Sequence, residues 1–335
     1  MQVGAGKIVV LGTGGTIAGT AANAGDNIGY TAAQVGVQQL LDAVPVLAAL
    51  AGGALVSEQV AQVDSKDMPF DVLLTLAARC AHHLADPTVA GLVITHGTDT
   101  IEETAWFLHA LLDARKPVVL TCAMRPATAL VPDGPQNLLD AVAVAAMPGA
   151  RGVVVVAAGA VHGALSVRKV HPYRIDAFDS GEQGPLGWVE EGRVRMAHAW
   201  PVNAALGPGV TGGSSEGTAA PSALPVWPRV EIVMNHSGAD GRVVDLLVAD
   251  GVAGLVVAAT GNGTLHHALE AALLRAQAAG VAVRVTTRCT LGRVLARPTD
   301  ALPVDAQGLS PVKARIALWL ELYRTRRTAQ GPAAG

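Results

Sequence analysis

Short runs of Val, Ile and Leu alternate along this chain with segments of helical periodicity, and this alternation constrains the fold most. The runs are nearly all apolar, as strands are when helices cover both faces of a parallel sheet. They are KIVVL at 7–11, GLVIT at 91–95, PVVLT at 117–121, GVVVV at 152–156, VEIVM at 230–234, GLVVAA at 254–259 and VAVRVT at 281–286. The sequence therefore predicts an α/β protein with a mostly parallel sheet flanked by helices.

Helices are expected between these runs. In TIEETAWFLHALLD, apolar residues recur at helical spacing, and Thr100 with Glu103 fits a capping box at the start of the helix. A last helix is predicted within KARIALWLELYRTRR at 313–327.

Composition changes at 207–228, which reads GPGVTGGSSEGTAAPSALPVWP and loses all periodicity. Gly, Ser, Pro and Thr in this density are typical of a linker or a long connection. We therefore expect a larger N-terminal catalytic α/β domain at 1–206, a linker at 207–228 and a smaller C-terminal α/β domain at 229–335.

Charge, cysteine and histidine content argue against several classes of function, namely nucleic-acid binding and metal binding. The chain has 24 basic and 27 acidic residues, so it lacks the basic excess of nucleic-acid-binding proteins. Cys80, Cys122 and Cys289 are far apart without CxxC spacing, and the 10 histidines include no HExxH, which argues against disulfides and metal. No apolar run suits a signal peptide or a membrane span. We expect a cytoplasmic protein with no metal, nucleic acid or membrane partner, and a small uncharged or zwitterionic ligand.

The stretch LGTGGTIAGT at 11–20 suggests either a phosphate-binding loop or a mount for a nucleophile. A dinucleotide fingerprint requires glycine where Ile17 stands, and a P-loop requires lysine after its last glycine, where this chain has Thr20. Neither phosphate motif is complete. What remains is Thr16, a hydroxyl that glycines leave accessible; the alternative is a threonine that only caps a helix or closes a turn.

A threonine hydroxyl needs a base before it can act as a nucleophile. The segment HGTD supplies Thr98 and Asp99, and VHGALSVRK supplies Lys169; both segments follow predicted strands. Ligands of open parallel sheets bind outside the carboxyl ends of the strands. Asp99 alone could be an early helix residue and Lys169 alone a solvated charge, but their joint placement favours a catalytic site.

Five motifs, in this order, resemble those of the bacterial-type L-asparaginases and glutaminase-asparaginases: LGTGGTIAG, HGTDTIEETAWFL, CAMRP, DGPQNL and TGNGTL. The resemblance runs from about residue 7 to residue 323. It implies hydrolysis of L-asparagine to L-aspartate and ammonia through a threonine acyl-enzyme, without metal or cofactor. It also implies a homotetramer built as a dimer of dimers.

Carried over by position, the resemblance assigns the catalytic residues. Thr16 would be the nucleophile, and Tyr30, on a mobile lid after the first strand, would bind its hydroxyl and close the site. Thr98, Asp99 and Lys169 would form a second catalytic group that relays protons and activates water. Backbone amides near the two threonines would stabilise the oxyanion.

The resemblance also assigns substrate contacts. Ser65 and Asp99 would hold the α-carboxylate and α-ammonium groups, the carbonyl of Ala123 would hold the amide nitrogen, and Asn262 would reach a neighbouring subunit's site. Lys66 stands where many relatives have Gln or Glu, and could contact the α-carboxylate or alter the use of asparagine against glutamine.

Two further functions stay open from the sequence. One is a glutaminase-asparaginase with substantial use of glutamine. The other is a regulatory protein that binds asparagine or aspartate and is catalytically weakened by the altered loops around Lys66 and after Cys289.

Overall fold

The computed structural model describes residues 6–52, 54–201 and 227–330, with side chains up to 326. The chain divides into two compact units, residues 1–222 and 223–335. Most of the predicted linker, residues 207–226, lies outside the described residues, so the linker and its boundaries stay a prediction.

The first unit contains an eight-stranded sheet in the order β10-β9-β6-β5-β4-β3-β1-β2. The parallel strands are β1 (Lys7–Gly14), β2 (Leu55–Val63), β3 (Val89–Thr95), β4 (Pro117–Thr121) and β5 (Gly152–Ala157). The antiparallel strands are β6 (Ala160–Gly163), β9 (Gly187–Glu190) and β10 (Arg193–Met196). The predicted mostly parallel sheet is therefore confirmed, and the sequence analysis missed β2 and the antiparallel strands.

The segment predicted to follow β5 as a loop is not a loop. The chain after β5 does not enter a loop that carries Lys169 but turns at once into the antiparallel β6. Lys169 lies further on, in the short strand β7 (Arg168–Lys169), which pairs with β8 (Phe178–Asp179). Strand β6 has only four residues, too short a run to be recognised in the sequence, so a loop was expected here.

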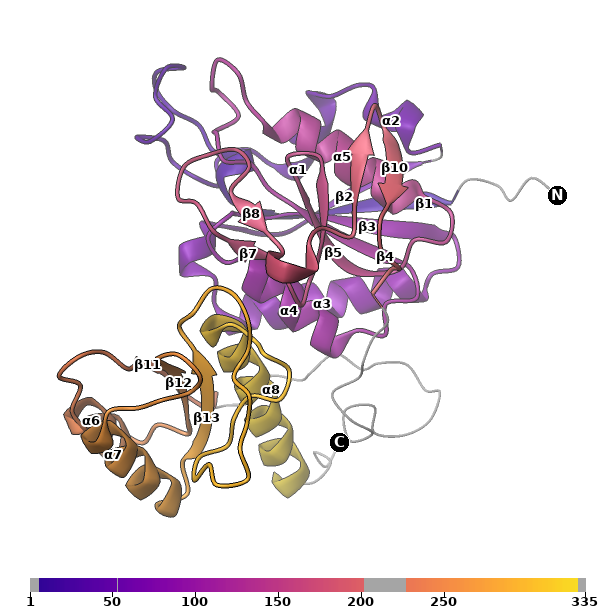
Figure 1. Cartoon of the computed structure of the whole chain (residues 1–335). Coiled ribbons are helices and arrows are strands. Elements are labelled where there is room, and N and C mark those ends of the chain that lie inside the picture. The colour runs from indigo at the N-terminus through magenta and orange to yellow at the C-terminus, as the bar shows by residue number, and fades with distance from the viewer. Residues whose placement is uncertain (1–5, 53, 202–226, 331–335) are drawn as a thin grey trace. The chain divides into compact units, whose positions relative to one another are not determined.

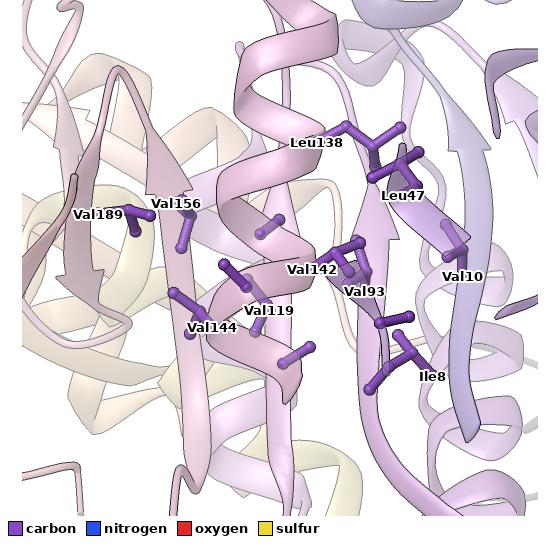
Figure 2. Packing of buried hydrophobic residues seen from close by; sticks show 14 of the residues in the cluster. Ile8, Val10, Leu47, Val93, Val119, Leu138, Val142, Val144, Val156 and Val189 are labelled. Atoms are coloured by element: carbon purple, nitrogen blue, oxygen red, sulfur yellow. The ribbon is translucent and has the colours of Figure 1, made fainter. Parts of the chain in front are cut away.

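Helices cover both faces of the sheet, with α1 (Val37–Asp42), α2 (Leu47–Leu50) and α5 (Gly134–Ala146) on one side and α3 (Phe70–Ala85) and α4 (Ile101–Leu111) on the other (Figure 1). Short 3₁₀ helices η1 (Thr16–Ala18), η2 (Ser65–Asp67) and η3 (Gly181–Gln183) follow β1, β2 and β8. Figure 2 shows that Leu138, Val142 and Val144 of α5 pack against the sheet, among buried valines of β3, β4 and β5. Burying each such side chain contributes about 1.5–3 kcal/mol, so the strand ends rest on a firm core.

The predicted capping box of α4 is wrong. Thr100 is the N-cap residue, but its side chain makes no capping hydrogen bond. Its hydroxyl instead donates to the carbonyl oxygen of Ser65 at 2.8 Å. This bond ties the start of α4 to η2, which carries a predicted substrate contact.

The second unit is a three-stranded parallel sheet in the order β11-β12-β13. The strands are β11 (Val230–Met234), β12 (Gly254–Ala259) and β13 (Ala282–Thr287), with helices α6 (Arg242–Ala249), α7 (His267–Ala278) and α8 (Pro311–Gln330). Leu255, Val257, Leu269 and Leu273 belong to its own hydrophobic core. None of the helices in the described part of the chain combines the length and apolar character that a bilayer crossing requires.

Candidate active site

The predicted site residues of the first unit lie at the topological switch point of the sheet. In the strand order β2-β1-β3-β4-β5, the chain runs from β1 to β2 on one side and then returns to β3 on the other side of β1. Such a reversal of the strand order opens a crevice at the carboxyl ends of β1 and β3. Thr16 follows β1, Ser65 follows β2, Thr98 follows β3 and Ala123 follows β4. All four are buried side by side at one edge of the sheet, as the sequence predicts for strand ends.

Glycine lets three of these turns touch. Gly14 and Gly15 have φ angles of 105° and 82°, a conformation that side chains rarely adopt. A Cβ at Gly15 would lie 2.3 Å from the Cα of Gly97, and one at Gly97 would lie 2.4 Å from Oγ of Ser65. The turns after β1 and β3 are therefore packed backbone against backbone, and the turn after β3 also packs against the side chain of Ser65.

We expect Gly97→Ala to lower the free energy of unfolding by about 2 kcal/mol or more, because the added methyl has no room against Ser65. Urea denaturation followed by circular dichroism measures this effect. Gly163→Ala is the matched control, since its Cβ meets only ordinary contacts at 3.6 Å. Equal stability of the two variants would contradict the close packing of the turns.

Thr16 is the first residue of η1 and is 6% exposed. Its hydroxyl shares a hydrogen bond of 2.7 Å with the phenol of Tyr30. Tyr30 directly follows a surface strap, residues 21–29, and paired backbone hydrogen bonds of 2.9 Å between Thr20 and Thr31 join the chain on either side. The fold thus presents an aromatic hydroxyl to Thr16 from a surface segment.

Thr98 is also 6% exposed, but its hydroxyl bonds the ammonium of a lysine, whereas that of Thr16 bonds the phenol of Tyr30. The ammonium of Lys169 donates to Oγ1 of Thr98 at 2.8 Å and to Oδ1 of Asp99 at 2.6 Å. The backbone N–H of Lys169 donates to the Glu102 carboxylate at 3.3 Å, which fixes β7 beside the start of α4. The structure therefore brings together the three residues that the sequence analysis assigns to the second catalytic group.

His96 lies beneath this group and is fully buried. Its Nδ1 is 2.8 Å from the carbonyl oxygen of Gly97, so this nitrogen carries the proton and donates, and Nε2 accepts from the Thr104 hydroxyl at 2.9 Å. Burial lowers the pKa of His96 to about 4. A neutral imidazole therefore holds the turn that carries Thr98.

We expect His96 to make the stability of the first unit pH-dependent. Its pKa falls from an ordinary 6.5 in the unfolded chain to about 4 in the fold, so below pH 6.5 the unfolded chain binds a proton that the fold excludes. The free energy of unfolding should fall by about 3 kcal/mol between pH 6.5 and pH 4. Urea denaturation across this range should show a shallower dependence in His96→Gln, and an unchanged one in His82→Gln, which alters an exposed histidine.

Two predicted substrate contacts lie beside the threonines. Ser65 is buried, and its Oγ accepts from the backbone N–H of Asp99 at 3.2 Å, which leaves the hydroxyl proton to donate elsewhere. Lys66 is exposed, and its ammonium donates to Asp64 at 2.7 Å and Asp67 at 2.9 Å. These hydrogen bonds raise the pKa of Lys66 above its usual range. The predicted contact of Lys66 with substrate stays a prediction.

Asn262 belongs to the second unit, in the turn between Thr260 and Thr264. Its amide exchanges two hydrogen bonds with the backbone of Leu295, at 2.7 and 3.2 Å. This contact fixes the orientation of the side chain within its own unit. Its predicted role at a neighbouring subunit's site stays a prediction.

Two residues without a predicted role, Asp133 and Asn137, shape the turn after β4. The carboxylate of Asp133 accepts from the backbone N–H groups of Met124 and Arg125 at 2.9 Å, and Asn137 donates to the carbonyl oxygen of Cys122 at 3.0 Å. Both belong to the motif DGPQNL, so the signal was present without an assigned role. They hold the backbone on both sides of Ala123.

Family models match both units of the chain. The model described as "Asparaginase, N-terminal" matches residues 7–201, and the one described as "Glutaminase/Asparaginase C-terminal domain" matches residues 229–331. The chain belongs to the asparaginase family. This membership confirms the resemblance, the α/β fold class and the assignment to the amidohydrolases.

Individual members of the family are similar over most of their length. "L-asparaginase 2" of Bacillus subtilis is 36% identical, covering 95% of this chain and 83% of that protein. "Glutaminase-asparaginase" of Pseudomonas fluorescens is 35% identical, covering 96% and 87%. The crystal structure of a "Probable Cytoplasmic L-asparaginase" from Campylobacter jejuni matches with a TM-score of 0.84 at 35% identity, covering 97% of both chains.

Within the described ranges, no three His, Cys, Asp or Glu side chains gather as the ligands of a metal ion would. The expected absence of a metal in the reaction of this family member stays a prediction.

Proposed function

We propose that this protein hydrolyses L-asparagine to L-aspartate and ammonia through an ester on Thr16. One observation carries the proposal: two buried threonines stand on touching turns at the crevice between β1 and β3, each bonded to a different proton-transferring group. Membership of the asparaginase family supports the substrate.

In the first step the hydroxyl oxygen of Thr16 attacks the side-chain amide carbon of the substrate. The hydroxyl proton passes through Tyr30 and the polar groups around it to the departing nitrogen, which leaves as ammonia. Backbone N–H groups of the touching turns would stabilise the oxyanion, a contribution worth about 3–4 kcal/mol per donor in hydrolases. The product of this step is an aspartyl ester on Thr16.

In the second step water attacks the ester carbon. Thr98, Lys169 and Asp99 form a chain of hydrogen bonds of 2.8 and 2.6 Å. When the Lys169 ammonium passes a proton to Asp99, the resulting amine can take the proton of the Thr98 hydroxyl, which in turn takes the proton of the attacking water. The Thr16 oxygen takes up a proton as L-aspartate leaves. The two steps together consume one asparagine and one water and release one aspartate and one ammonia.

The charged ends of asparagine suit the neighbouring groups. The Ser65 hydroxyl can donate to the α-carboxylate, because its oxygen already accepts from Asp99. The Asp99 carboxylate uses Oδ1 for Lys169, and its Oδ2 can accept from the α-ammonium. The carbonyl oxygen of Ala123, held in place through Asp133 and Asn137, can accept from the side-chain amide.

Glutamine is the second candidate substrate, since relatives named glutaminase-asparaginase are similar over most of the chain. We also propose a cytoplasmic homotetramer. The names of relatives differ in compartment, with a cytoplasmic protein in Campylobacter jejuni and a periplasmic one in Haemophilus influenzae. Light scattering tests the assembly, and fractionation of cells tests the compartment.

Steady-state release of ammonia from L-asparagine, L-glutamine and D-asparagine tests the activity. The proposal requires the highest kcat/KM for L-asparagine. Calorimetric binding of aspartate without any release of ammonia would instead favour the weakened regulatory protein.

A further inference from the structure

Strand β7 carries Lys169 but has only two residues. It pairs with the two residues of β8, and these strands form a sheet apart from the eight-stranded one (Figure 1). A two-stranded hairpin is at best marginally stable by itself. The position of the Lys169 ammonium therefore depends on what holds the chain before and after β7.

The chain before β7 is anchored in the core of the first unit. Val167 is fully buried, and its N–H donates at 2.9 Å to the carbonyl oxygen of Gly163, the last residue of β6. The N–H of Lys169 then donates to the carboxylate of Glu102 on α4 at 3.3 Å. The large sheet and α4 therefore fix the side from which the chain enters β7.

The chain after β7 forms a turn, residues 170–177, that is held from within. Residues 172–176 are all exposed. The N–H groups of Val170 and His171 both donate to the carbonyl oxygen of Ala177, at 2.8 and 3.2 Å. Among the residues that the structure describes, the hydrogen bonds of this turn stay inside it. No neighbouring element of the described chain therefore holds the turn closed by a hydrogen bond.

The ring of His171 closes this turn. Its Nδ1 accepts from the N–H of Tyr173 at 3.1 Å and from that of Arg174 at 3.0 Å. A ring nitrogen accepts only without a proton, so the neutral ring carries its proton on Nε2. A second contact in the turn, the ion pair of Arg174 with Asp176, joins two exposed side chains, and such pairs contribute little. Closure of the turn therefore depends mainly on the imidazole.

The strap that leads to Tyr30 contains the same arrangement. Oδ1 of Asp26 accepts from the N–H groups two and three residues later, at 2.9 and 2.7 Å, as Nδ1 of His171 does. Side-chain acceptors in this position stabilise turns. Both groups that bond a site threonine, the phenol of Tyr30 and the ammonium of Lys169, therefore have such a turn beside them in the chain.

We propose that His171 is a positioning residue for Lys169: by closing the turn after β7, its Nδ1 keeps the lysine ammonium within reach of Thr98. Without this acceptor the turn opens for part of the time, and β7 is then anchored on one side only. Protons pass between groups at hydrogen-bond distance, so a displaced ammonium slows the transfer. The catalytic consequence rests on the proposed function and concerns its second step, whereas the effect on the position of Lys169 does not.

Two variants separate the acceptor from the bulk of the ring. His171→Phe keeps a ring of similar size but has no acceptor, whereas His171→Asn keeps an acceptor, since its Oδ1 can take the place of Nδ1. His236→Phe is the matched control. Nδ1 of His236 also bonds a backbone group beside it, the carbonyl oxygen of Ser237 at 2.9 Å, but in the second unit.

Trace acetylation of the full chain with acetic anhydride, followed by mass spectrometry, measures the position of Lys169 without any turnover of asparagine. The side chain of Lys169 is only 16% exposed, so its amine should react slowly in the parent and about threefold faster or more in His171→Phe. Lys7, which also pairs with a carboxylate, is the internal standard. His171→Asn and His236→Phe should react as the parent does.

Steady-state kinetics with L-asparagine give the second readout. In an acyl-enzyme reaction kcat/KM reports the steps up to formation of the ester, whereas kcat also includes its hydrolysis. His171→Phe should therefore lower kcat and KM together by about threefold or more and leave kcat/KM unchanged. A general loosening of the fold would lower kcat/KM as well. His171→Asn should keep about half or more of the kcat of the parent.

Unchanged acetylation of Lys169 in His171→Phe, or the same changes in His171→Phe and His171→Asn, would overturn the proposal. Faster acetylation with unchanged kcat, or with a fall in kcat/KM, would overturn the catalytic consequence alone. A parent protein that releases no ammonia, but whose variants show the expected order of acetylation, would contradict the proposed function and leave the positioning role of His171 standing.

Discussion

Replacing Thr16 by valine is expected to lower kcat for L-asparagine by about 10⁴-fold or more, the loss typical of removing a nucleophile. Valine keeps the shape of threonine, so the buried η1 should pack as before and the loss should reflect the missing hydroxyl. Steady-state ammonia release measures kcat, and mass spectrometry after denaturation should find an aspartyl adduct on the parent protein but not on this variant.

Thr75→Val serves as the control for this substitution. Thr75 lies on α3, where its hydroxyl only donates to the carbonyl oxygen of Asp71 at 2.8 Å. Its kcat should equal that of the parent. Appreciable turnover in Thr16→Val, with an adduct at another residue, would show that the nucleophile is misassigned.

Lys169→Met is expected to have the second largest effect. It removes the donor that joins Thr98 to Asp99 and leaves both without this partner. Loss of a positioned proton-transfer group should lower kcat by about 10²- to 10⁴-fold. Because the group is assigned to the second step, the aspartyl ester should still form, and rapid quenching with mass spectrometry should find it accumulated.

Lys7→Met is the matched control for the loss of an ion pair. Lys7 contacts Asp86 at 2.7 Å, close to the 2.6 Å of Lys169 and Asp99, but at the opposite end of β1 from the site. It should leave kcat unchanged. If Lys169→Met lost activity without any accumulated ester, the lysine would belong to the first step instead.

The parallel strands could be predicted because they are buried on both faces. Strands β4 and β12 have exactly the predicted limits, Pro117–Thr121 and Gly254–Ala259, and every residue of each is buried. In such strands the apolar run in the sequence coincides with the strand. The end of the run therefore also predicts the carboxyl end of the strand, after which the site residues follow.

Strand β2 could not be found in this way because it is an edge strand with polar residues. Ser57, Glu58 and Gln59 each bond a neighbouring helix: Ser57 donates to Gln38 at 2.6 Å and Gln59 accepts from the N–H of Val37 at 2.8 Å. Glu58 accepts from Arg79 on α3. Because these side chains are polar and bond neighbouring helices, β2 contains no apolar run, and the strand prediction depends on such a run.

The site itself was predictable only in part. The segments after the strands indicated Thr16, Thr98, Asp99 and Lys169 as candidates, but Lys169 lies 71 residues after Thr98 and reaches it through β7, a strand of two residues. No local pattern encodes so distant a contact, so the hydrogen bonds that Lys169 makes could not be predicted from the strand ends.

The contact between the turns of Gly15 and Gly97 limits how this enzyme can be re-engineered. A side chain added at Gly15 or Gly97 would displace the neighbouring turn at a cost in stability, and glycine has no side chain to remove, so the size of the crevice cannot easily be changed at these two positions. Directed evolution toward bulkier amides must therefore act on other walls. Residues 21–29 are a segment to vary, because they lead to Tyr30, which bonds Thr16, and because Ile28 among them is 80% exposed.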